Sequence, residues 1–347
     1  MANTTTAAHI PTTTITNSTS DDSATKHSLL IFKIACLCAI SIVGMIGNVT
    51  IFTTLFRRKL KSSEYFILNL ALTDMMVCAI GIPLDIYQEL HAGAWQYGAV
   101  LCKVIYPFQT LLVLISILTL TAMSLERYRA IMTPLKQLLR KPVIMASIGF
   151  IWCLGVAAVA PYSKILTYSY PSCEEKWPVT HDGNYYTLAL FIIDYCIPLT
   201  IIVFCYSRAG FDLYQSTQQF KDGAVSAFKN QNIAFRKRVQ RNKHVIKVFS
   251  FAVLMFIVCM LPGDCYWMWT SFGDGSSFEY DDHLQTFTNI LVYANSAINP
   301  FIFGACRMAC FRVLCKRGGA ENRGLTSRSS WSFRSWSSRR TIRETTL

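Results

Sequence analysis

Residues 104–125 read VIYPFQTLLVLISILTLTAMSL, and this stretch contains no charged side chain. A helix needs roughly 20 mostly apolar residues to cross the hydrocarbon core of a bilayer, so this segment is long enough to span it. Six further stretches share its length and apolar character. The predicted transmembrane spans are therefore 34–56, 66–84, 104–125, 143–163, 186–207, 248–263 and 284–306.

The composition of the 347-residue chain also indicates a membrane protein. Apolar residues make up 52% of the chain and charged residues only 15%, with a mean hydropathy of +0.33. Soluble chains usually carry about 25% charged residues. The net charge of +13 does not indicate nucleic-acid binding, because the positive charges lie between apolar runs and not on one face of a folded domain. We predict an all-α membrane protein, a bundle of seven transmembrane helices.

The distribution of charge predicts the orientation of this bundle. The connections on one side and the carboxyl-terminal segment hold 27 of the 33 Lys and Arg residues, which places that side in the cytoplasm. Thirteen of the 20 acidic residues lie outside or in the outer halves of spans. The sequons at Asn3 and Asn17 predict glycosylation of an exposed amino terminus. We expect an extracellular tail (1–28), the helical domain (29–306), a short amphipathic juxtamembrane helix 8 (307–316) and a disordered cytoplasmic tail (317–347).

Two pairs of cysteines stand out by their position. Cys102 heads the third span and Cys173 lies in the second outer loop. Because both face an oxidising compartment, we predict a disulfide between them. Cys310 and Cys315 follow the seventh span beside basic residues, which makes them candidates for palmitoylation. The alternative for this second pair is buried or idle thiols.

Several polar side chains lie at membrane depth, where ionisable groups are costly and mark function. Asp74 is in the middle of the second span. We expect it to face amide and hydroxyl groups of other spans, where waters or a sodium ion could solvate it. The alternative is a hydrogen-bonded structural core without an ion. No other cofactor and no further metal site are predicted. The residues expected to share this network are Asn48, Ser116, Asn295, Ser296 and Asn299.

The third span ends at Glu126-Arg127-Tyr128, on the cytoplasmic edge. Glu126 can neutralise Arg127 in one state of the protein and release it in another. The alternative is an ordinary interfacial Arg that extends toward water. Taken alone, the three residues do not decide between these interpretations.

Taken together, these features resemble the rhodopsin-like (class A) G-protein-coupled receptors over about residues 29–316. That resemblance implies a plasma-membrane receptor without a catalytic site, which binds a ligand outside and activates heterotrimeric G proteins inside. The matching motifs are Gly47-Asn48, Leu68 through Asp74, Trp95, Cys102, Glu126-Arg127-Tyr128, Trp152, Cys173, Pro198 with Tyr206, Phe256 with Cys259 through Pro262, and Asn295 through Asn299-Pro300.

The chain departs from this family pattern at the inner switch positions. Met260 replaces the usual Trp before Leu261-Pro262. Phe303 replaces the Tyr that the family usually carries three residues after the Pro of the Asn299-Pro300 pair. Phe303 cannot make the water-bridged hydroxyl contact to Tyr206 that the resemblance implies for an active state. Asn242 stands where an acidic partner of Arg127 is often found. We therefore expect a weaker lock on the inactive state.

The resemblance also narrows the class of ligand. Tyr293 stands where opsins carry the Lys that binds retinal, and Gln109 stands where monoamine receptors carry an Asp. The loop Cys173 through Pro178 is similar to that of neuropeptide receptors of the RFamide, neuropeptide Y, orexin, galanin and ghrelin types. An acidic outer side concentrates a cationic ligand. The expected contacts of a cationic peptide, with or without an amidated end, are Asp85, Glu174, Asp194 and Asp264, above a floor of Gln109 and Tyr293.

On the cytoplasmic side, the resemblance implies a crevice for a Gα subunit formed by Arg127, Tyr206 and residues 236–247. The basic residues there also suit anionic membrane lipids. Phosphorylation of the Ser/Thr-rich tail would recruit an arrestin, and the final Glu344-Thr345-Thr346-Leu347 fits a PDZ domain. Two alternatives to a peptide receptor remain: a receptor for a lipid or other small molecule, and a channel or proton-coupled transporter.

Overall fold

The structure is a computed structural model that describes residues 13–57, 59–60, 62–133, 139–179, 181–222, 229–273, 278 and 280–326. Side chains are described from Thr25 to Gly304 with gaps, most of them between 216 and 241. Asn3 and Leu347 lie outside the described residues, and the side chains of Asn17, Cys310 and Cys315 are not described. The glycosylation, palmitoylation and PDZ predictions therefore stay predictions.

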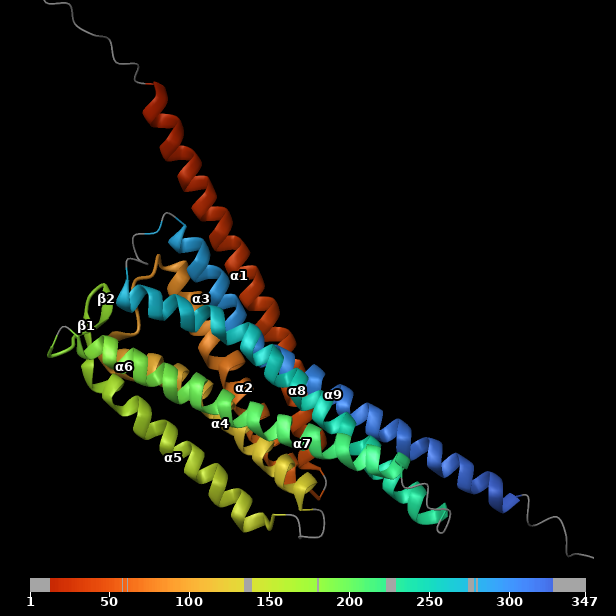
Figure 1. Ribbon diagram of the computed structural model, residues 1–347. Coiled ribbons are helices and arrows are strands. Elements are labelled where there is room, and N and C mark those ends of the chain that lie inside the picture. The colour runs from red at the N-terminus through yellow and green to blue at the C-terminus, as the bar shows by residue number, and fades with distance from the viewer. Residues whose placement is uncertain are drawn as a thin grey trace, which may run out of the picture. The chain divides into compact units, whose positions relative to one another are not determined.

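Helices make up nearly all of the described chain (Figure 1). One short antiparallel hairpin connects two of them on the outer side. In chain order the elements are α1 (Thr13–Phe56), α2 (Ser62–Met76), η1 (Val77–Gly81), α3 (Ile82–Leu90), α4 (Gly98–Met132), α5 (Lys141–Ile165), β1 (Leu166–Ser169), β2 (Ser172–Glu175), α6 (Asp182–Phe191), η2 (Ile192–Cys196), α7 (Ile197–Asp222), α8 (Lys229–Phe272) and α9 (Asp281–Thr326).

Each predicted span lies within this helical framework, and the helices extend past the predicted ends. Within the part of the chain that the structure describes, six helical stretches are long and apolar enough to cross a membrane: 25–56, 62–90, 98–132, 141–165, 182–215 and 242–272. The seventh predicted span lies on α9, which is less apolar because it carries Asn289, Asn295, Ser296 and Asn299. The last three are buried, whereas Phe287 and Phe301 are exposed on the outside of this helix. The polar side chains of α9 therefore lie on the face that points into the bundle.

The first and last helices extend well past the predicted spans. Helix α1 begins at Thr13, and α9 continues as helix to Thr326. The predicted bounds of the two tails and of the juxtamembrane helix at 307–316 stay predictions. Contacts divide the chain into one unit ending at Phe303 and a second from Gly304 onward. The bundle described below is the first unit.

Two of the spans contain a π-helical turn immediately before a proline. The turn η1 precedes Pro83, and η2 precedes Pro198. Proline has no backbone N–H and disrupts the hydrogen-bond ladder of an α-helix, and a π-turn, which inserts one residue, is a common accommodation found at functional sites. The turns hold Gly81 and Asp194, both of which line the cavity described below.

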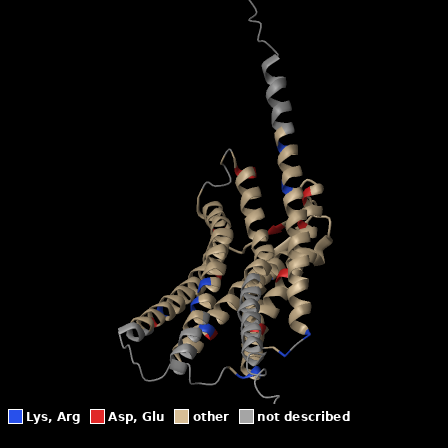
Figure 2. Cartoon of the chain, turned by 90° about the vertical axis from the view of Figure 1, so that its right-hand side faces the viewer, with Lys and Arg blue, Asp and Glu red and all other residues tan. Residues whose placement is uncertain are grey.

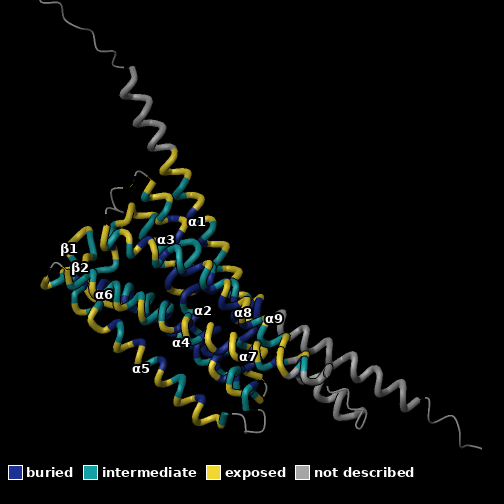
Figure 3. The backbone as a smooth tube through the Cα atoms, viewed as in Figure 1, coloured by how far each residue is buried: buried dark blue, intermediate teal, exposed yellow. Residues whose placement is uncertain are grey.

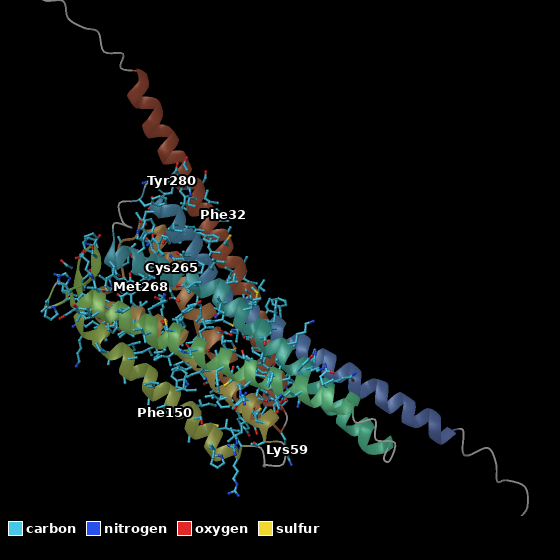
Figure 4. The ribbon with its side chains drawn as sticks, viewed as in Figure 1. Phe32, Lys59, Phe150, Cys265, Met268 and Tyr280 are labelled. Carbon is cyan, nitrogen blue, oxygen red and sulfur yellow. A yellow bond between two sulfur atoms is a disulfide. The ribbon has the colours of Figure 1, made fainter. Side chains whose placement is uncertain are left out.

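The core of the bundle surrounds α4, which packs against α2, α5 and α7. Figure 3 shows buried residues concentrated on α2 and α4, whereas α5 is mostly exposed or intermediate. The large side chains of Phe32 on α1 and Phe150 on α5 lie on the outer surface (Figure 4), 58% and 67% exposed. Such apolar outer faces suit contact with lipid.

The described charges agree with the predicted orientation. Lys and Arg gather toward one end of the helices, although α1 also carries basic residues toward its other end (Figure 2). Two of these are Lys26 and Lys33. Lys26 forms an exposed ion pair with Asp282 at 3.4 Å, and Lys33 is taken up below.

Small residues allow α1 to approach its neighbours closely. A Cβ atom added at Gly47 would lie 2.7 Å from Cβ of Pro300, and one added at Gly44 would lie 2.6 Å from Sγ of Cys78. The proline ring cannot rotate away, so the α1–α9 contact requires glycine at position 47. By contrast, nothing lies within 4 Å of a Cβ added at Gly149 on α5.

We predict that Gly47→Ala lowers the stability of the purified protein by about 1–3 kcal/mol, because the added methyl group overpacks a close contact. Thermal unfolding in detergent measures this. The matched control is Gly149→Ala, which adds the same methyl group to an open surface and should leave the melting temperature unchanged or raise it. Equal effects of the two substitutions would contradict this account of the α1–α9 contact.

Candidate functional site

A cavity of about 580 Å³ lies in the outer half of the bundle. Its walls come from η1, α3, α4, α5, the hairpin, α6, η2, α8 and α9. This volume is within the range of cavities that hold a small molecule or one end of a larger ligand. Met268 of α8, labelled in Figure 4, is among its lining residues.

The hairpin forms part of the outer wall of the cavity. Strands β1 and β2 pair antiparallel, with Leu166 opposite Glu175 and Tyr168 opposite Cys173. The predicted disulfide is confirmed, because Cys173 is bonded to Cys102 at the head of α4. The backbone N–H of Trp95 also donates a hydrogen bond of 2.7 Å to the carbonyl of Pro171. Two covalent or hydrogen-bonded attachments thus hold the hairpin against the bundle.

One corner of the cavity brings together three of the predicted ligand contacts. Gln109 on α4 donates a hydrogen bond of 2.8 Å from its side-chain nitrogen to Oδ1 of Asp85 on α3. The hydroxyl of Tyr293 on α9 donates to Oδ2 of the same carboxylate. Both oxygens of Asp85 therefore have partners within the protein. We call these three residues, together with the Lys33–Glu89 ion pair described next, the Asp85 corner.

The same corner contains an ion pair that sequence reasoning missed. Lys33 on α1 is only 5% exposed, and its Nζ lies 2.5 Å from Oε1 of Glu89, which lines the cavity. In the sequence, Lys33 is an ordinary basic residue just before the first predicted span. No periodicity in α1 distinguishes it, so only the contact with α3 reveals its role.

The opposite wall holds two acidic residues without such partners. Asp194 in η2 and Asp264 in α8 both line the cavity and repel one another electrostatically. Oδ1 of Asp194 is buried and accepts no hydrogen bond from any described residue. Among the described residues that line the cavity, none is Lys, Arg or His. We call Asp194 and Asp264 the acidic wall.

The structure places one of the predicted loop residues outside the cavity lining. Glu174 is exposed and does not line the cavity, whereas its neighbour Glu175 does. Successive side chains of a strand point to opposite faces, so only one of these two neighbours can face inward. The carboxylate of Glu175 accepts a hydrogen bond of 2.7 Å from the indole nitrogen of Trp177. Trp177 therefore already stabilises the negative charge of Glu175 in part.

Below the cavity lies the predicted polar network around Asp74, which is fully buried. Asn299 donates a hydrogen bond of 3.0 Å to its Oδ2, and Oδ1 has no hydrogen-bond partner among the described residues. The side chain of Asn48 donates to the carbonyls of Gly44 and Ser296, both at 3.0 Å.

The cavity floor reaches this network, because Ser116, Asn295 and Ser296 line the cavity. Ser116 shares a hydrogen bond of 3.1 Å with Thr73, so it contacts Asp74's neighbour in the helix. A carboxylate oxygen without a partner, together with nearby amide and hydroxyl oxygens, fits a hard monovalent cation. Asp74, Ser116, Ser296 and Asn299 would hold such an ion.

At the inner end, Arg127 is held by two contacts. Its Nε lies 3.1 Å from Oε2 of Glu126, an ion pair whose geometry does not form a hydrogen bond. Its guanidinium group also lies 5.8 Å from the ring centre of Phe249 on α8. The Phe249 ring in turn packs against Phe303, with centroids 5.6 Å apart. Tyr128 contacts Phe204, a ring of the exposed face of α7.

The remaining predicted switch residues lie in the core between α4, α7, α8 and α9. Ser124 and Tyr206 are hydrogen-bonded through their hydroxyl groups, which are 2.9 Å apart. Tyr206 therefore has a partner on α4 and does not depend on position 303. Met260 is buried and lines the cavity floor, two residues before Pro262 of α8. Pro300 packs near Gly47, as described above.

Known proteins are similar to this chain over about three quarters of its length. Residues 47–303 match the family described as 7 transmembrane receptor (rhodopsin family). The chain is 28% identical to neuropeptide FF receptor 2 of Mus musculus, over 76% of this chain and 67% of that protein. It is 29% identical to galanin receptor type 1 of Mus musculus, over 75% and 74%. It is also 29% identical to bombesin receptor subtype-3 of Ovis aries, over 77% and 71%.

We predict that sodium stabilises the protein through Asp74. At a sodium concentration tenfold above the dissociation constant, binding to the folded state adds on the order of 1 kcal/mol of stability. The measurement is the melting temperature in sodium chloride against choline chloride at equal ionic strength. Asp74→Asn should abolish the difference, whereas Asp212→Asn, a carboxylate on α7 away from this network, should keep it. Equal melting temperatures of the unmodified protein in both salts would contradict the ion site.

Proposed function

This chain belongs to the rhodopsin family of seven-transmembrane receptors, and from that membership we propose that a cationic peptide activates it by entering the outer cavity. Membership makes the chain a multi-pass G-protein-coupled receptor of the plasma membrane, and not an enzyme. It also sets aside a channel or transporter as its function. The proposal concerns the ligand and the residues that recognise it.

The acidic wall is the observation that carries the proposal. Five acidic residues line the cavity: Asp85, Glu89, Glu175, Asp194 and Asp264. The first three have partners within the protein, namely Tyr293 and Gln109, Lys33, and Trp177. Among the described residues that line the cavity, no cation accompanies Asp194 or Asp264, and Asp194 accepts a hydrogen bond only from its own backbone N–H. Because an unpaired charge in a low-dielectric site is costly, a ligand cation that approaches this wall gains a strong interaction.

A peptide fits this cavity better than a lipid does. The cavity is partly open, so the rest of a peptide can extend from it, and the acidic lining disfavours an acyl chain. The relatives named above are receptors called after the peptides neuropeptide FF, galanin and bombesin. An amidated end is suited to the Asp85 corner, which offers both hydrogen-bond donors and acceptors.

On the inner side, the contacts of Arg127 describe a held state. Glu126 compensates its charge and Phe249 covers its guanidinium group. We infer that a movement of α8 that removes the Phe249 ring frees Arg127 for a Gα subunit. This aromatic contact takes the place of the acidic partner that the sequence lacks at Asn242. Recruitment of an arrestin and of a PDZ protein by residues 327–347 is part of the proposal and lies outside the described residues.

We predict that Asp194→Asn and Asp264→Asn each weaken activation by a cationic peptide by roughly 10- to 100-fold, the size expected for losing a charge-assisted hydrogen bond of about 1.5–3 kcal/mol. The probe is a set of synthetic amidated hexapeptides that each contain one Arg or Lys, screened on cells by G-protein dissociation. The potency of every active peptide is then measured on each variant.

Glu174→Gln is the matched control, because it removes one carboxylate from the exposed face of the hairpin. Its potency should equal that of the unmodified receptor. Two outcomes contradict the proposal: no peptide of the set activates the receptor, or potency is unchanged in both Asp variants while cell-surface expression is normal.

We also predict that Phe249→Leu raises agonist-independent GDP release by about 2- to 30-fold, because a cation–π contact of roughly 0.5–2 kcal/mol no longer stabilises the held state of Arg127. Receptor in nanodiscs with purified G protein provides the measurement. The control is Phe251→Leu, the same substitution at a position of α8 that is 50% exposed. Basal release that is the same in both variants would show that Phe249 does not restrain Arg127.

A further inference from the structure

The two acidic parts of the cavity carry different net charge. At the Asp85 corner, the carboxylates of Asp85 and Glu89 are accompanied by the ammonium group of Lys33. At the acidic wall, Asp194 and Asp264 have no accompanying cation among the described residues. When all of these groups are ionised, the formal charge of the corner is one negative unit and that of the wall is two.

Lys33 is built into the corner and is not free to leave it easily. Its side chain is 6% exposed, whereas that of Glu89 is 36% exposed and reaches the cavity. The Lys33 ammonium also attracts the Asp85 carboxylate, and Glu89 repels it. A buried charge that loses its partner becomes strongly unfavourable. Lys33 and Glu89 thus depend on one another, and this ion pair fastens α1 to α3 beside the ligand cavity.

We propose that Lys33 is an internal counter-ion that sets the charge selectivity of the receptor, a conclusion that rests on the proposed function. By occupying the place beside Glu89 and Asp85, Lys33 leaves no need for a ligand cation there. The cation of the ligand goes to the acidic wall, and the corner receives an uncharged hydrogen-bonding group. The preferred ligand therefore carries one buried basic group and not two.

This proposal predicts how selectivity follows the charge of the corner. In Lys33→Gln the corner has two negative units and gains a place for a second basic group. In Glu89→Gln the Lys33 ammonium opposes Asp85 alone, and the corner becomes neutral. In the double variant Lys33→Gln/Glu89→Gln only Asp85 remains charged, as one negative unit. The double variant thus restores the charge of the unmodified corner without its ion pair.

The experiment compares two matched sets of synthetic amidated hexapeptides, one with a single Arg or Lys and one with two. The readout is the ratio of potencies of the dibasic and monobasic peptides on each receptor. One unit charge acting over about 10 Å at an effective dielectric constant near 20 changes this ratio on the order of tenfold. The ratio should rise in Lys33→Gln, fall in Glu89→Gln and return to that of the unmodified receptor in the double variant.

A purely structural role for the ion pair gives a different pattern, because all three variants lack the pair and the double variant would then resemble the single ones. That outcome, or a ratio that is unchanged in Lys33→Gln, overturns the proposal. If Lys33→Gln does not reach the cell surface, the comparison of Glu89→Gln with the double variant still decides, since their ratios must differ by about tenfold. Failure of every monobasic peptide on the unmodified receptor would instead contradict the proposed function.

Discussion

The need to compensate charges inside the bundle governs the arrangement of this receptor. In a medium where water is scarce, a carboxylate requires a cation or hydrogen-bond donors. Glu126 has Arg127, Glu89 has Lys33, and Asp85 has Gln109 and Tyr293. The contacts of Glu89 and Asp85 join helices that are distant in the sequence, so they also hold the bundle together. The negative charge that remains without a partner is concentrated at Asp194 and Asp264, and the cation of the proposed ligand compensates it.

Much of the fold could be predicted from the sequence because the bilayer imposes a simple rule on length and polarity. Long uncharged stretches predicted the spans, and the position of Cys102 and Cys173 on the outer side predicted their disulfide. The π-turns before Pro83 and Pro198 were not predicted. A proline indicates that the backbone must adjust, but packing around it decides whether the helix kinks or takes in an extra residue.

The site was predictable in outline and not in detail. Asp85, Gln109 and Tyr293 were all expected to contact the ligand, and the structure brings them together. Lys33 and Phe249 were missed because nothing about an isolated Lys or Phe reveals its partner across the bundle. The choice between Glu174 and Glu175 depended on the register of the hairpin, which a single loop sequence does not determine. The depth of a residue along a span can thus be predicted from the sequence, whereas its contacts with other helices are known only from the folded structure.

The π-turn η2 has a consequence for how receptors of this kind diversify. An α-helix turns by about 100° per residue, so one inserted residue rotates everything on one side of it relative to the other. Asp194 lies within that turn. Deleting a single codon there would swing the carboxylate toward a neighbouring helix or the lipid, and bring another residue to the wall. A change of ligand preference could therefore arise in one genetic step, with no substitution among the residues that contact the ligand.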